Sequence, residues 1–340
     1  VDVDGAYCGG GSLRQRSLHA IDNEVMFVPA WGQKRIWGMV DSRPDWCLSR
    51  QRSWGLPIPA FQMPDGSMLL TSATTRAVAD VFGREGSDAW FTKSCEELLA
   101  SWDAANDPDA PTGVDISSLS KTYDIFDVWM ESGSSWNAVM RRRGLGYPAD
   151  LYLEGSDQHR GWFQLSMLPA MGVTGQPPYR TVLTHGFMVD RDGRKMSKSG
   201  DNALNVEDLL KDVGADVCRW LVSSLAFEND KRVDLELFQI AGESYRKVRN
   251  TLRYLLSNIG EEAPNIDAVD IPATSLDAWL LGELETMRLG VCQSLQNYEF
   301  RKAHIAIFDF CNETLSAMYC VAVKDRLYCD AADSPRRVRA

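Results

Sequence analysis

An apolar run, a helical pattern and a second apolar run follow one another over residues 150–186, and this order constrains the fold most strongly. The first run spans 150–153, apolar residues at helical spacing follow over 161–171 and end near Gly172, and the second run spans 180–184. Strand, helix and strand within about 35 residues predict a βαβ crossover, the unit of a parallel sheet. Ligands of such sheets bind beyond the carboxyl ends of the strands. Glu154-Gly155 and His185-Gly186, which end the two runs, are therefore predicted to belong to one site.

The pattern of hydrophobic residues along the chain changes at about residue 235. Residues 25–225 mix short β-rich runs with helical patterns, whereas the later part shows long helical patterns over 237–259, 275–298 and 301–328. The first of these patterns ends at Gly260, a connector spans 261–274, and three such helices predict a bundle. Its apolar face is predicted to contain Leu237, Ile240, Tyr245, Val248, Leu252, Leu255 and Ile259. The expected fold class is α/β with a parallel sheet, followed by an all-α helical bundle.

Composition excludes several classes of protein. The 340 residues are 44% hydrophobic and 24% charged, a balance typical of soluble globular domains. A net charge of −11 argues against a protein that coats DNA, and no apolar stretch approaches the roughly 20 residues of a membrane span. The eight cysteines are dispersed without a Cys-x-x-Cys pair, so we expect no zinc site and a reducing, cytoplasmic location.

The segment Lys195-Met196-Ser197-Lys198-Ser199 carries the sharpest chemical signal. It follows a predicted hairpin over 187–195 whose turn is Asp192-Gly193, and Asn205 is the predicted N-cap of a helix over 206–211. Two lysines three positions apart, with two hydroxyls, suit a polyphosphate and the charge that develops on its leaving group. An isolated segment of this composition is more often a polar surface turn.

A second constellation is Glu154-Gly155-Ser156-Asp157-Gln158, which joins the first strand to the following helix. A glycine at a strand end lets a ligand approach the backbone, and a carboxylate just after it can accept hydrogen bonds from ribose hydroxyls. An ordinary N-cap with a polar first turn explains this segment equally well. His185 at the next strand end is either a ligand contact or a structural residue, and convergence of the strand ends favours contact.

The segment 195–199 resembles the signature loop of the class I aminoacyl-tRNA synthetases, and a resemblance to the isoleucyl branch of that family extends from about Leu13 to Arg337. Segments 154–163, 43–59 and 127–136 carry it, with Cys47 matching isoleucyl rather than leucyl enzymes. The resemblance implies that Gly155, Asp157 and Gln158 hold the ribose and that Glu154 lies beside the adenylate. It places His185, Gly186, Val189 and Met196 at the adenylate too, and gives the catalytic role to Lys195, Ser197, Lys198 and Ser199. Trp129 and Trp162 would line the amino-acid pocket.

The same resemblance implies a division of the chain and a reaction. Residues 1–25 would end the connection to an editing insertion, 26–225 would form the second half of a Rossmann-like catalytic domain, and 235–340 would begin an anticodon-binding helical domain. L-isoleucine would be activated with ATP and Mg²⁺ and transferred to tRNA(Ile), without DNA or membrane partners. Two departures from the family pattern are Met130-Glu131 in place of Phe-Asp, which should leave the fold intact, and Gly200-Asp201, which could weaken loop closure.

A class I site also needs a His-x-Gly-His motif, and none of the four histidines (His19, His159, His185 and His304) lies in one. With no initiator Met, we expect the other half of the site and most of the editing insertion upstream, a zinc-binding segment downstream, and no activity in this piece alone. One alternative is a non-catalytic tRNA-binding module derived from a synthetase. A valyl or leucyl relative and a purely structural protein are the others.

Overall fold

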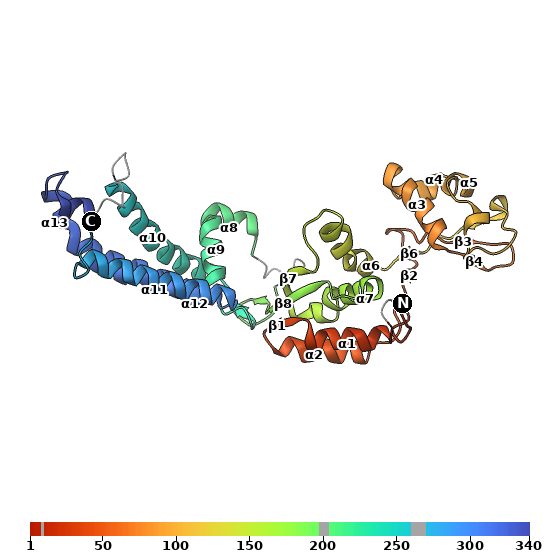
Figure 1. Ribbon diagram of the computed structural model, residues 1–340, viewed down its shortest axis with the longest axis horizontal. Helices are drawn as coiled ribbons and strands as arrows, with labels where there is room; N and C mark the ends of the chain where they lie inside the picture. The colour runs from red at the N-terminus through yellow and green to blue at the C-terminus, as the bar shows by residue number, and fades with distance from the viewer. Residues whose placement is uncertain (8–9, 197–203, 260–269) are drawn as a thin grey trace. The chain divides into compact units, whose positions relative to one another are not determined.

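The computed structural model describes residues 1–7, 10–196, 204–259 and 270–340 (Figure 1). The chain forms two compact units, Val1–Thr184 and His185–Ala340, each with hydrophobic cores of its own. This division by contacts differs from the predicted division at residues 25, 225 and 235, which rests on family resemblance and stays a prediction.

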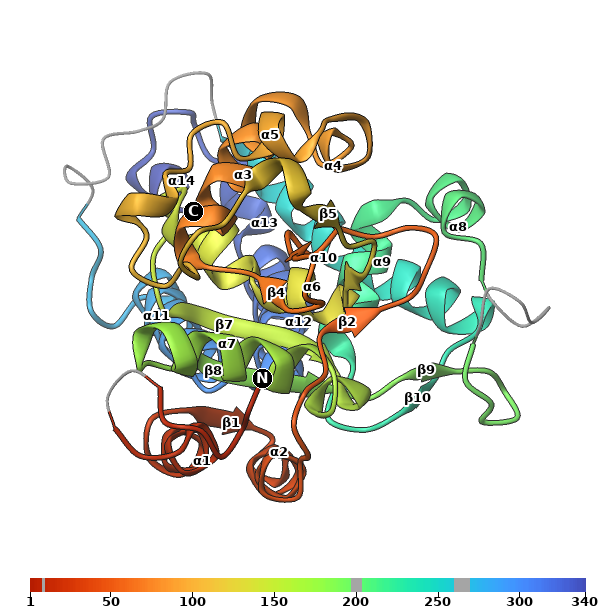
Figure 2. The same cartoon turned by 90° about the vertical axis from the view of Figure 1, so that its right-hand side faces the viewer.

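A three-stranded sheet organises the first unit, with β8 (Tyr179–His185) between β1 (Met26–Val28) and β7 (Ala149–Gly155) (Figure 2). β1 and β8 run parallel, with Phe27 opposite Val182. Helix α7 (Trp162–Thr174) connects β7 to β8, so the predicted βαβ crossover is confirmed. The helix continues past Gly172 and ends at Gly175, whose φ of 75° is a left-handed conformation that glycine adopts without steric cost.

The main core of the first unit lies between this sheet and its helices. Helices α1 (Leu13–Asn23) and α2 (Trp31–Asp41) contact α7, and Ile21, Ile36, Phe163 and Tyr179 are fully buried there. Residues 163–168 and 170–171 of α7 are all buried, which is why this helix is apolar on every side.

A second core of the first unit lies within residues 60–122 and is built around Trp90, Phe61 and Leu98. Strand β3 (Phe61–Gln62) pairs with both β4 (Met68–Leu69) and β5 (Ser120–Lys121). The helices are α3 (Ser72–Glu85), α4 (Ala89–Thr92), α5 (Cys95–Leu98), η1 (Ala104–Asn106) and η2 (Ile116–Ser118). The antiparallel pair β2 (Ser49–Arg50) and β6 (Ile125–Phe126) joins this region to α6 (Val128–Gly133) and the π-helix η3 (Trp136–Arg141).

The second unit begins with the predicted hairpin, which is confirmed. Val189 pairs with Lys195, and the turn places Gly193 at a φ of 79°. An additional pairing was not predicted, because β9 (Met188–Val189) also lies parallel to β10 (Lys231–Arg232). Asn205 caps α8 (Val206–Asp212) by accepting a hydrogen bond from the Glu207 amide, as predicted.

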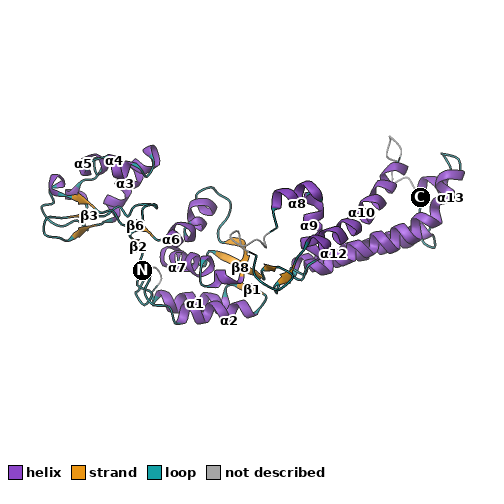
Figure 3. Ribbon diagram, turned by 180° about the vertical axis from the view of Figure 1, so that it is seen from behind, coloured by secondary structure: helices purple, strands orange, loops and turns teal. Residues whose placement is uncertain are grey.

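Helices form most of the second unit (Figure 3). The long ones are α10 (Leu235–Asn258), α11 (Leu276–Gln296) and a continuous helix from Phe300 to Cys329, which confirms the three predicted helices. The last of these consists of α12 (Phe300–Asp309), the π-helical η6 (Phe310–Tyr319) and α13 (Cys320–Cys329); α9 (Ala215–Ser224) and α14 (Pro335–Arg339) complete the unit.

The helix Phe300–Cys329 corrects one expectation from composition, because it is long and apolar enough to cross a membrane by length and composition alone. Packing within the second unit accounts for part of this apolar character. Phe310 and Leu315 are buried in a core shared with Val248 of α10, and Arg326 forms an ion pair of 2.9 Å with the buried Asp277 of α11. The apolar residues on this face of the helix therefore pack within the bundle.

The predicted apolar face of α10 is only partly right. Val248 is buried, but Ile240, Leu252 and Ile259 are about half exposed. The residues of α10 that are buried are Phe238, Ala241, Gly242, Val248 and Thr251. Helix α9 packs against α10 with Val217 beside Gly242, so the buried face includes the small residues 241 and 242 and differs from the one that large apolar residues indicate. Gly260 and most of the predicted connector lie outside the described residues.

Candidate active site

The carboxyl end of β7 forms the first part of the candidate site. Gly155 is buried at the end of the strand, Glu154 before it is exposed, and the short helix η4 (Ser156–His159) follows directly. The Glu154 carboxylate accepts a hydrogen bond of 3.2 Å from the Gly155 amide. Asp157 lies half-buried in the first turn of η4. The structure thus brings together the predicted ribose-binding residues at one strand end.

Gln158 has a structural task in this segment that its sequence position did not reveal. Its Oε1 accepts a hydrogen bond of 2.9 Å from the Trp162 amide and so caps the first turn of α7. Because a backbone N–H can only donate, this contact fixes the orientation of the Gln158 amide group. The side-chain nitrogen is then the end of Gln158 that can meet a ligand.

His159 packs inside the protein and does not face solvent. Its ring is fully buried, with Nδ1 3.0 Å from the Ser156 carbonyl oxygen and Nε2 3.4 Å from the Thr184 hydroxyl. The carbonyl can only accept, so Nδ1 carries the proton and Nε2 is left as an acceptor. Burial lowers the pKa of His159, which keeps the ring neutral.

The two tryptophans predicted to line the amino-acid pocket lie near each other at the start of α7. The Trp162 ring stacks on Tyr152 at a centroid distance of 4.1 Å, and its Nε1 donates to the Ser132 carbonyl at 3.0 Å. The Trp129 ring lies directly against Gly161, the residue before Trp162. Both tryptophans are half-buried, so each keeps an exposed edge at this end of the sheet.

Asp127 anchors this arrangement, although no individual role was predicted for it. The carboxylate is 6% exposed and accepts hydrogen bonds from the Trp46 indole at 3.0 Å, from Arg50 at 2.6 Å and from the Trp129 amide at 3.1 Å. These contacts fix β2 to the start of α6. Partners nearly 80 residues apart leave no local signal in the sequence, so only the folded chain reveals this role.

The departure at Met130-Glu131 leaves the fold intact, as expected. Glu131 accepts a hydrogen bond of 3.2 Å from the Leu56 amide, and Met130 packs on the main core. The Glu131 carboxylate therefore connects α6 to the loop before β3.

The second unit holds the other predicted site residues, and its backbone needs a glycine at one of them. The amide of Gly186 donates to the Phe227 carbonyl at 2.8 Å, and a Cβ at residue 186 would lie 2.2 Å from the Asn229 carbonyl carbon. His185 places Nδ1 2.8 Å from the Gly186 carbonyl oxygen, and Val189 is buried in β9. This segment therefore follows the 227–230 backbone closely before the hairpin begins.

Lys195 and Met196 end the described part of the predicted catalytic loop. The Lys195 ammonium lies 3.8 Å from the centroid of the Phe187 ring, a cation–π contact, and Met196 is half-buried against the core around Phe238. Ser197, Lys198 and Ser199, together with the departure at Gly200-Asp201, lie outside the described residues. Of the four predicted catalytic residues, the structure therefore describes Lys195 alone.

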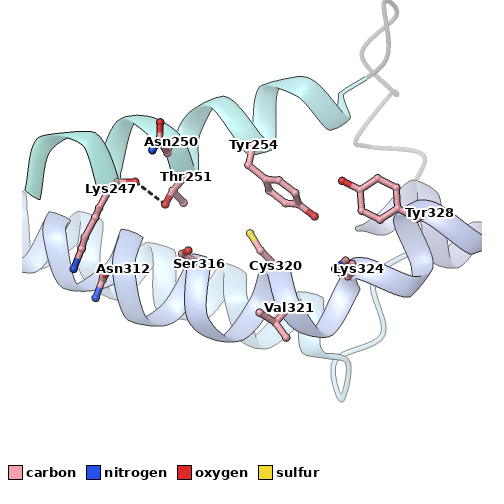
Figure 4. Close-up of a pocket in the computed structure, with 10 residues that line it drawn as sticks. All are labelled: Lys247, Asn250, Thr251, Tyr254, Asn312, Ser316, Cys320, Val321, Lys324 and Tyr328. Atoms are coloured by element: carbon pink, nitrogen blue, oxygen red, sulfur yellow. Dashed lines mark hydrogen bonds between the residues drawn. The ribbon is translucent and has the colours of Figure 1, made fainter. Parts of the chain in front are cut away.

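A polar groove in the second unit was not predicted. It lies between α10 and the η6–α13 part of the long helix and has a volume of about 630 Å³ (Figure 4). Its lining is mainly polar and aromatic, with residues 247, 250, 251 and 254 on one side and 312, 316, 320, 321, 324 and 328 on the other. Lys247 and Lys324 both line it, and among the described residues no carboxylate lies within ion-pair distance of either.

Metal ligands are sparse over the ranges that the structure describes, where no group of three or more His, Cys, Asp or Glu side chains could hold an ion. Mg²⁺ that arrives with a nucleotide needs no such group, because phosphate oxygens and water supply most of its ligands.

Two family models match the chain. A model of the class I tRNA synthetases (I, L, M and V) matches residues 6–234, and a model of the anticodon-binding domain of tRNA ligases matches residues 277–340. The isoleucine–tRNA ligase of Geobacter sulfurreducens is 44% identical over 328 residues, which cover 96% of this chain and 35% of the relative. That of Campylobacter curvus is 39% identical over 341 residues, which cover 99% and 36%. The chain thus spans about a third of the length of these relatives.

Solved structures share the fold at lower sequence identity. The LeuRS of Agrobacterium radiobacter K84, in a ternary complex with tRNA and LeuAMS, superposes with a TM-score of 0.60 at 17% identity, covering 87% of this chain and 37% of that one. The methionyl-tRNA synthetase of Mycobacterium tuberculosis bound by methionyl-adenylate gives a TM-score of 0.52 at 20% identity, covering 96% and 55%. Both structural similarities agree with an α/β domain that is followed by a helical region.

Proposed function

We propose, because this chain belongs to the class I tRNA synthetases of the I, L, M and V group, that it carries part of a site that activates L-isoleucine with ATP and transfers it to tRNA(Ile). The observation that carries this proposal is the match of nearly the whole chain to isoleucine–tRNA ligases at 39–44% identity. The strand end at Gly155, with Asp157 and Gln158 on the following turn, agrees with the binding of a nucleoside there.

The first step joins the amino acid to the nucleotide. A carboxylate oxygen of isoleucine attacks the α-phosphorus of ATP, and the bond from that phosphorus to the bridging oxygen breaks to release pyrophosphate. The lysines of the loop, Lys195 and Lys198, stabilise the charge that develops on this leaving group. Ser197 and Ser199 add hydrogen bonds to it. Mg²⁺ would arrive bound to ATP and would supply neutralising charge at the phosphates.

Other residues hold the adenylate while it forms. Gly155 lets the nucleoside approach the backbone, Asp157 accepts from the ribose hydroxyls, and the Gln158 amide nitrogen donates to the ribose. Glu154, His185, Gly186, Val189 and Met196 lie beside the adenylate, in the roles that the family resemblance implies. In the second step a terminal ribose hydroxyl of tRNA attacks the acyl carbon, and AMP leaves. Positioning carries most of such a rate enhancement, because the chemistry needs no covalent catalyst.

A further part of the proposal concerns the half of the site that this chain does not contain. None of its four histidines lies in a His-x-Gly-His motif, and half of a phosphate clamp positions ATP poorly. We expect isoleucine-dependent exchange of pyrophosphate into ATP to be undetectable with the 340 residues alone. Exchange should appear when a segment with the His-x-Gly-His motif is supplied, fused or in trans. A cytoplasmic location for this reaction stays a prediction.

The same exchange assay decides between the competing functions. If no exchange occurs with the supplied segment and the protein still binds tRNA, the enzyme proposal is overturned and a non-catalytic tRNA-binding module is favoured. Exchange that prefers valine or leucine would point to a relative with another substrate. Isoleucyl enzymes separate isoleucine from valine by only about 150-fold before editing, so valine has to be tested at matched concentrations.

Binding of tRNA by the helical region is supported by the groove between α10 and the long helix. Lys247 and Lys324 place two positive charges there in a chain whose net charge is −11. Each lysine that contacts a phosphate releases a counterion, so K247Q and K324Q should each lower the slope of log affinity against log salt by about 1. Lys211 is the matched control, because it lies on α8 and pairs with Asp208. Equal slopes in all three variants would place the RNA elsewhere on the molecule.

A further inference from the structure

Gly161 is buried at the start of α7, and two side chains occupy the space that a Cβ would need. A Cβ there would lie 2.7 Å from Gln158 Oε1 and 3.0 Å from Cη2 of the Trp129 ring. Carbon atoms in good van der Waals contact lie about 3.5–4.0 Å apart, so both distances are too short. Gln158 cannot simply turn away, because its Oε1 caps α7 through the Trp162 amide. The Trp129 ring therefore lies against the helix only because residue 161 has no side chain.

The surroundings of Trp129 leave its ring as the group that moves if residue 161 grows. The Trp162 ring is fixed by its stacking on Tyr152 and by the hydrogen bond from its Nε1 to the Ser132 carbonyl. The backbone of α6 is fixed at both ends. Asp127 accepts from the Trp129 amide, and Gly133 packs so tightly that a Cβ there would lie 2.1 Å from the Leu165 carbonyl oxygen. The Trp129 side chain, which is half-buried, is not held by a hydrogen bond of this kind to any described residue and has room to turn.

We propose that Gly161 is a specificity-determining residue that sets the position of Trp129 as a wall of the amino-acid pocket. The inference rests on the proposed function, since it takes Trp129 and Trp162 as the lining of that pocket. Isoleucine and valine differ by one methylene, and pockets of this kind discriminate by the fit of that group alone. A wall displaced by an added methyl at residue 161 no longer fits the longer side chain. G161A therefore lowers the preference for isoleucine over valine by about tenfold.

The position of the ring is tested on the 340-residue chain itself, labelled with 5-fluorotryptophan. The ¹⁹F resonance of Trp129 is assigned as the one missing from the spectrum of W129F. G161A should shift this resonance and leave that of Trp220 unchanged. G172A is the matched control, because it adds the same methyl to the same helix with Tyr7 at an ordinary 3.9 Å. An unshifted Trp129 resonance in G161A, or an equal shift in G172A, would overturn the inference.

Selectivity is measured by pyrophosphate exchange with isoleucine and with valine, using the chain with the His-x-Gly-His segment supplied. G161A should lower the ratio of the two kcat/KM values, while G172A should keep it. W129F removes the ring atoms that meet residue 161, so G161A in a W129F background should change the ratio no further. An unchanged ratio in G161A overturns the inference and leaves the proposed function standing. A wild-type protein that exchanges neither amino acid counts against the proposed function, while the fluorine comparison still decides whether Gly161 places Trp129.

Discussion

At the scale of single residues, the site depends on groups whose partners lie far away in the sequence. Asp127 connects residues 46, 50 and 129 through one carboxylate, and His159 joins η4 to Thr184 at the end of β8. The sequence marked the motifs that contain both residues, because local spacing is visible in a chain. Their roles were not predictable, since each depends on a tertiary contact that no local pattern encodes.

The buried Asp127 carboxylate should contribute more to the free energy of unfolding than a carboxylate on the protein surface does. D127N replaces one acceptor oxygen by a donor that faces the Trp46 indole and Arg50, so we expect the free energy of unfolding to fall by about 2–3 kcal/mol. Urea unfolding followed by tryptophan fluorescence measures this loss. Asp150, which is 98% exposed and 3.6 Å from Arg180, is the control, and D150N should change stability by no more than about 0.5 kcal/mol. Equal effects would mean that the Asp127 contacts contribute nothing.

His159 predicts a dependence of stability on pH. The pKa of His159 in the folded protein is lowered from the ordinary value of 6.5. Just below pH 6.5 the unfolded chain therefore binds a proton at His159, while the folded chain does not. The stability from the neutral ring is therefore complete above pH 6.5 and falls as the pH drops toward the folded pKa. Unfolding of the first unit at pH 7.5 and pH 5 should show this slope, and H159Q should flatten it. H19Q, at an exposed position of α1, should leave the slope unchanged.

At the scale of elements, the hairpin of residues 187–195 was predictable and its neighbour was not. Asp192-Gly193 is a local turn signal, and the turn forms as expected. Strand β10 is two residues long and pairs with β9 across more than 40 residues, so neither its length nor its composition distinguishes it from a loop. The buried face of α10 was only partly predictable for a similar reason, because the small residues on it contribute little to a hydrophobic pattern.

Gly186 should control the pairing of β9 with β10. A methyl at this residue would overlap the backbone of Asn229, so G186A should separate the two strands. Hydrogen exchange measures this directly, because the amides of Lys231 and Val233 donate to the Phe187 and Val189 carbonyls at 2.8 and 3.0 Å. Both amides should exchange faster in the variant. G282A on α11 is the control, because an added Cβ there would have no neighbouring atom of the described residues within 4 Å. This variant should stabilise its helix by about 1 kcal/mol.

At the scale of the whole molecule, the fold class was predictable because each half has its own periodicity. Alternating strand and helix patterns predicted the parallel sheet, and long helical patterns predicted the bundle. The contact-based boundary between Thr184 and His185 was not predicted, although it falls where the predicted strand 180–184 ends, because a division into units depends on tertiary contacts that no local pattern encodes. Likewise, the groove depends on how two helices diverge, and hydrophobic patterns contain no such information.

Separate cores in the two units predict separate unfolding transitions. Of the eleven tryptophans only Trp220 and Trp279 lie in the second unit, so fluorescence reports mainly on the first, whereas circular dichroism at 222 nm weights the helices of the second. Urea titrations followed by the two signals should give different midpoints, the mark of unfolding that is not two-state. Coincident midpoints and a single slope would instead show that the units unfold as one.

The π-helical turns of η6 have a consequence for insertions and deletions. A π turn holds more residues than an α turn, so side chains four apart fall short of a full rotation in η6 and overshoot it in α13. The two errors offset each other, which keeps Asn312, Ser316, Cys320, Lys324 and Tyr328 in phase along one side of the groove. Deleting one residue of η6 removes about 100° of rotation, while conversion of its remaining π turns to the tighter α form adds rotation, so the two changes partly cancel and Lys324 and Tyr328 stay near the side of Asn312. The groove therefore tolerates the loss of one residue from η6 better than a loss from α13, where no π turn offsets the missing rotation, and a one-residue gap aligned in η6 would mark a relative that keeps the groove.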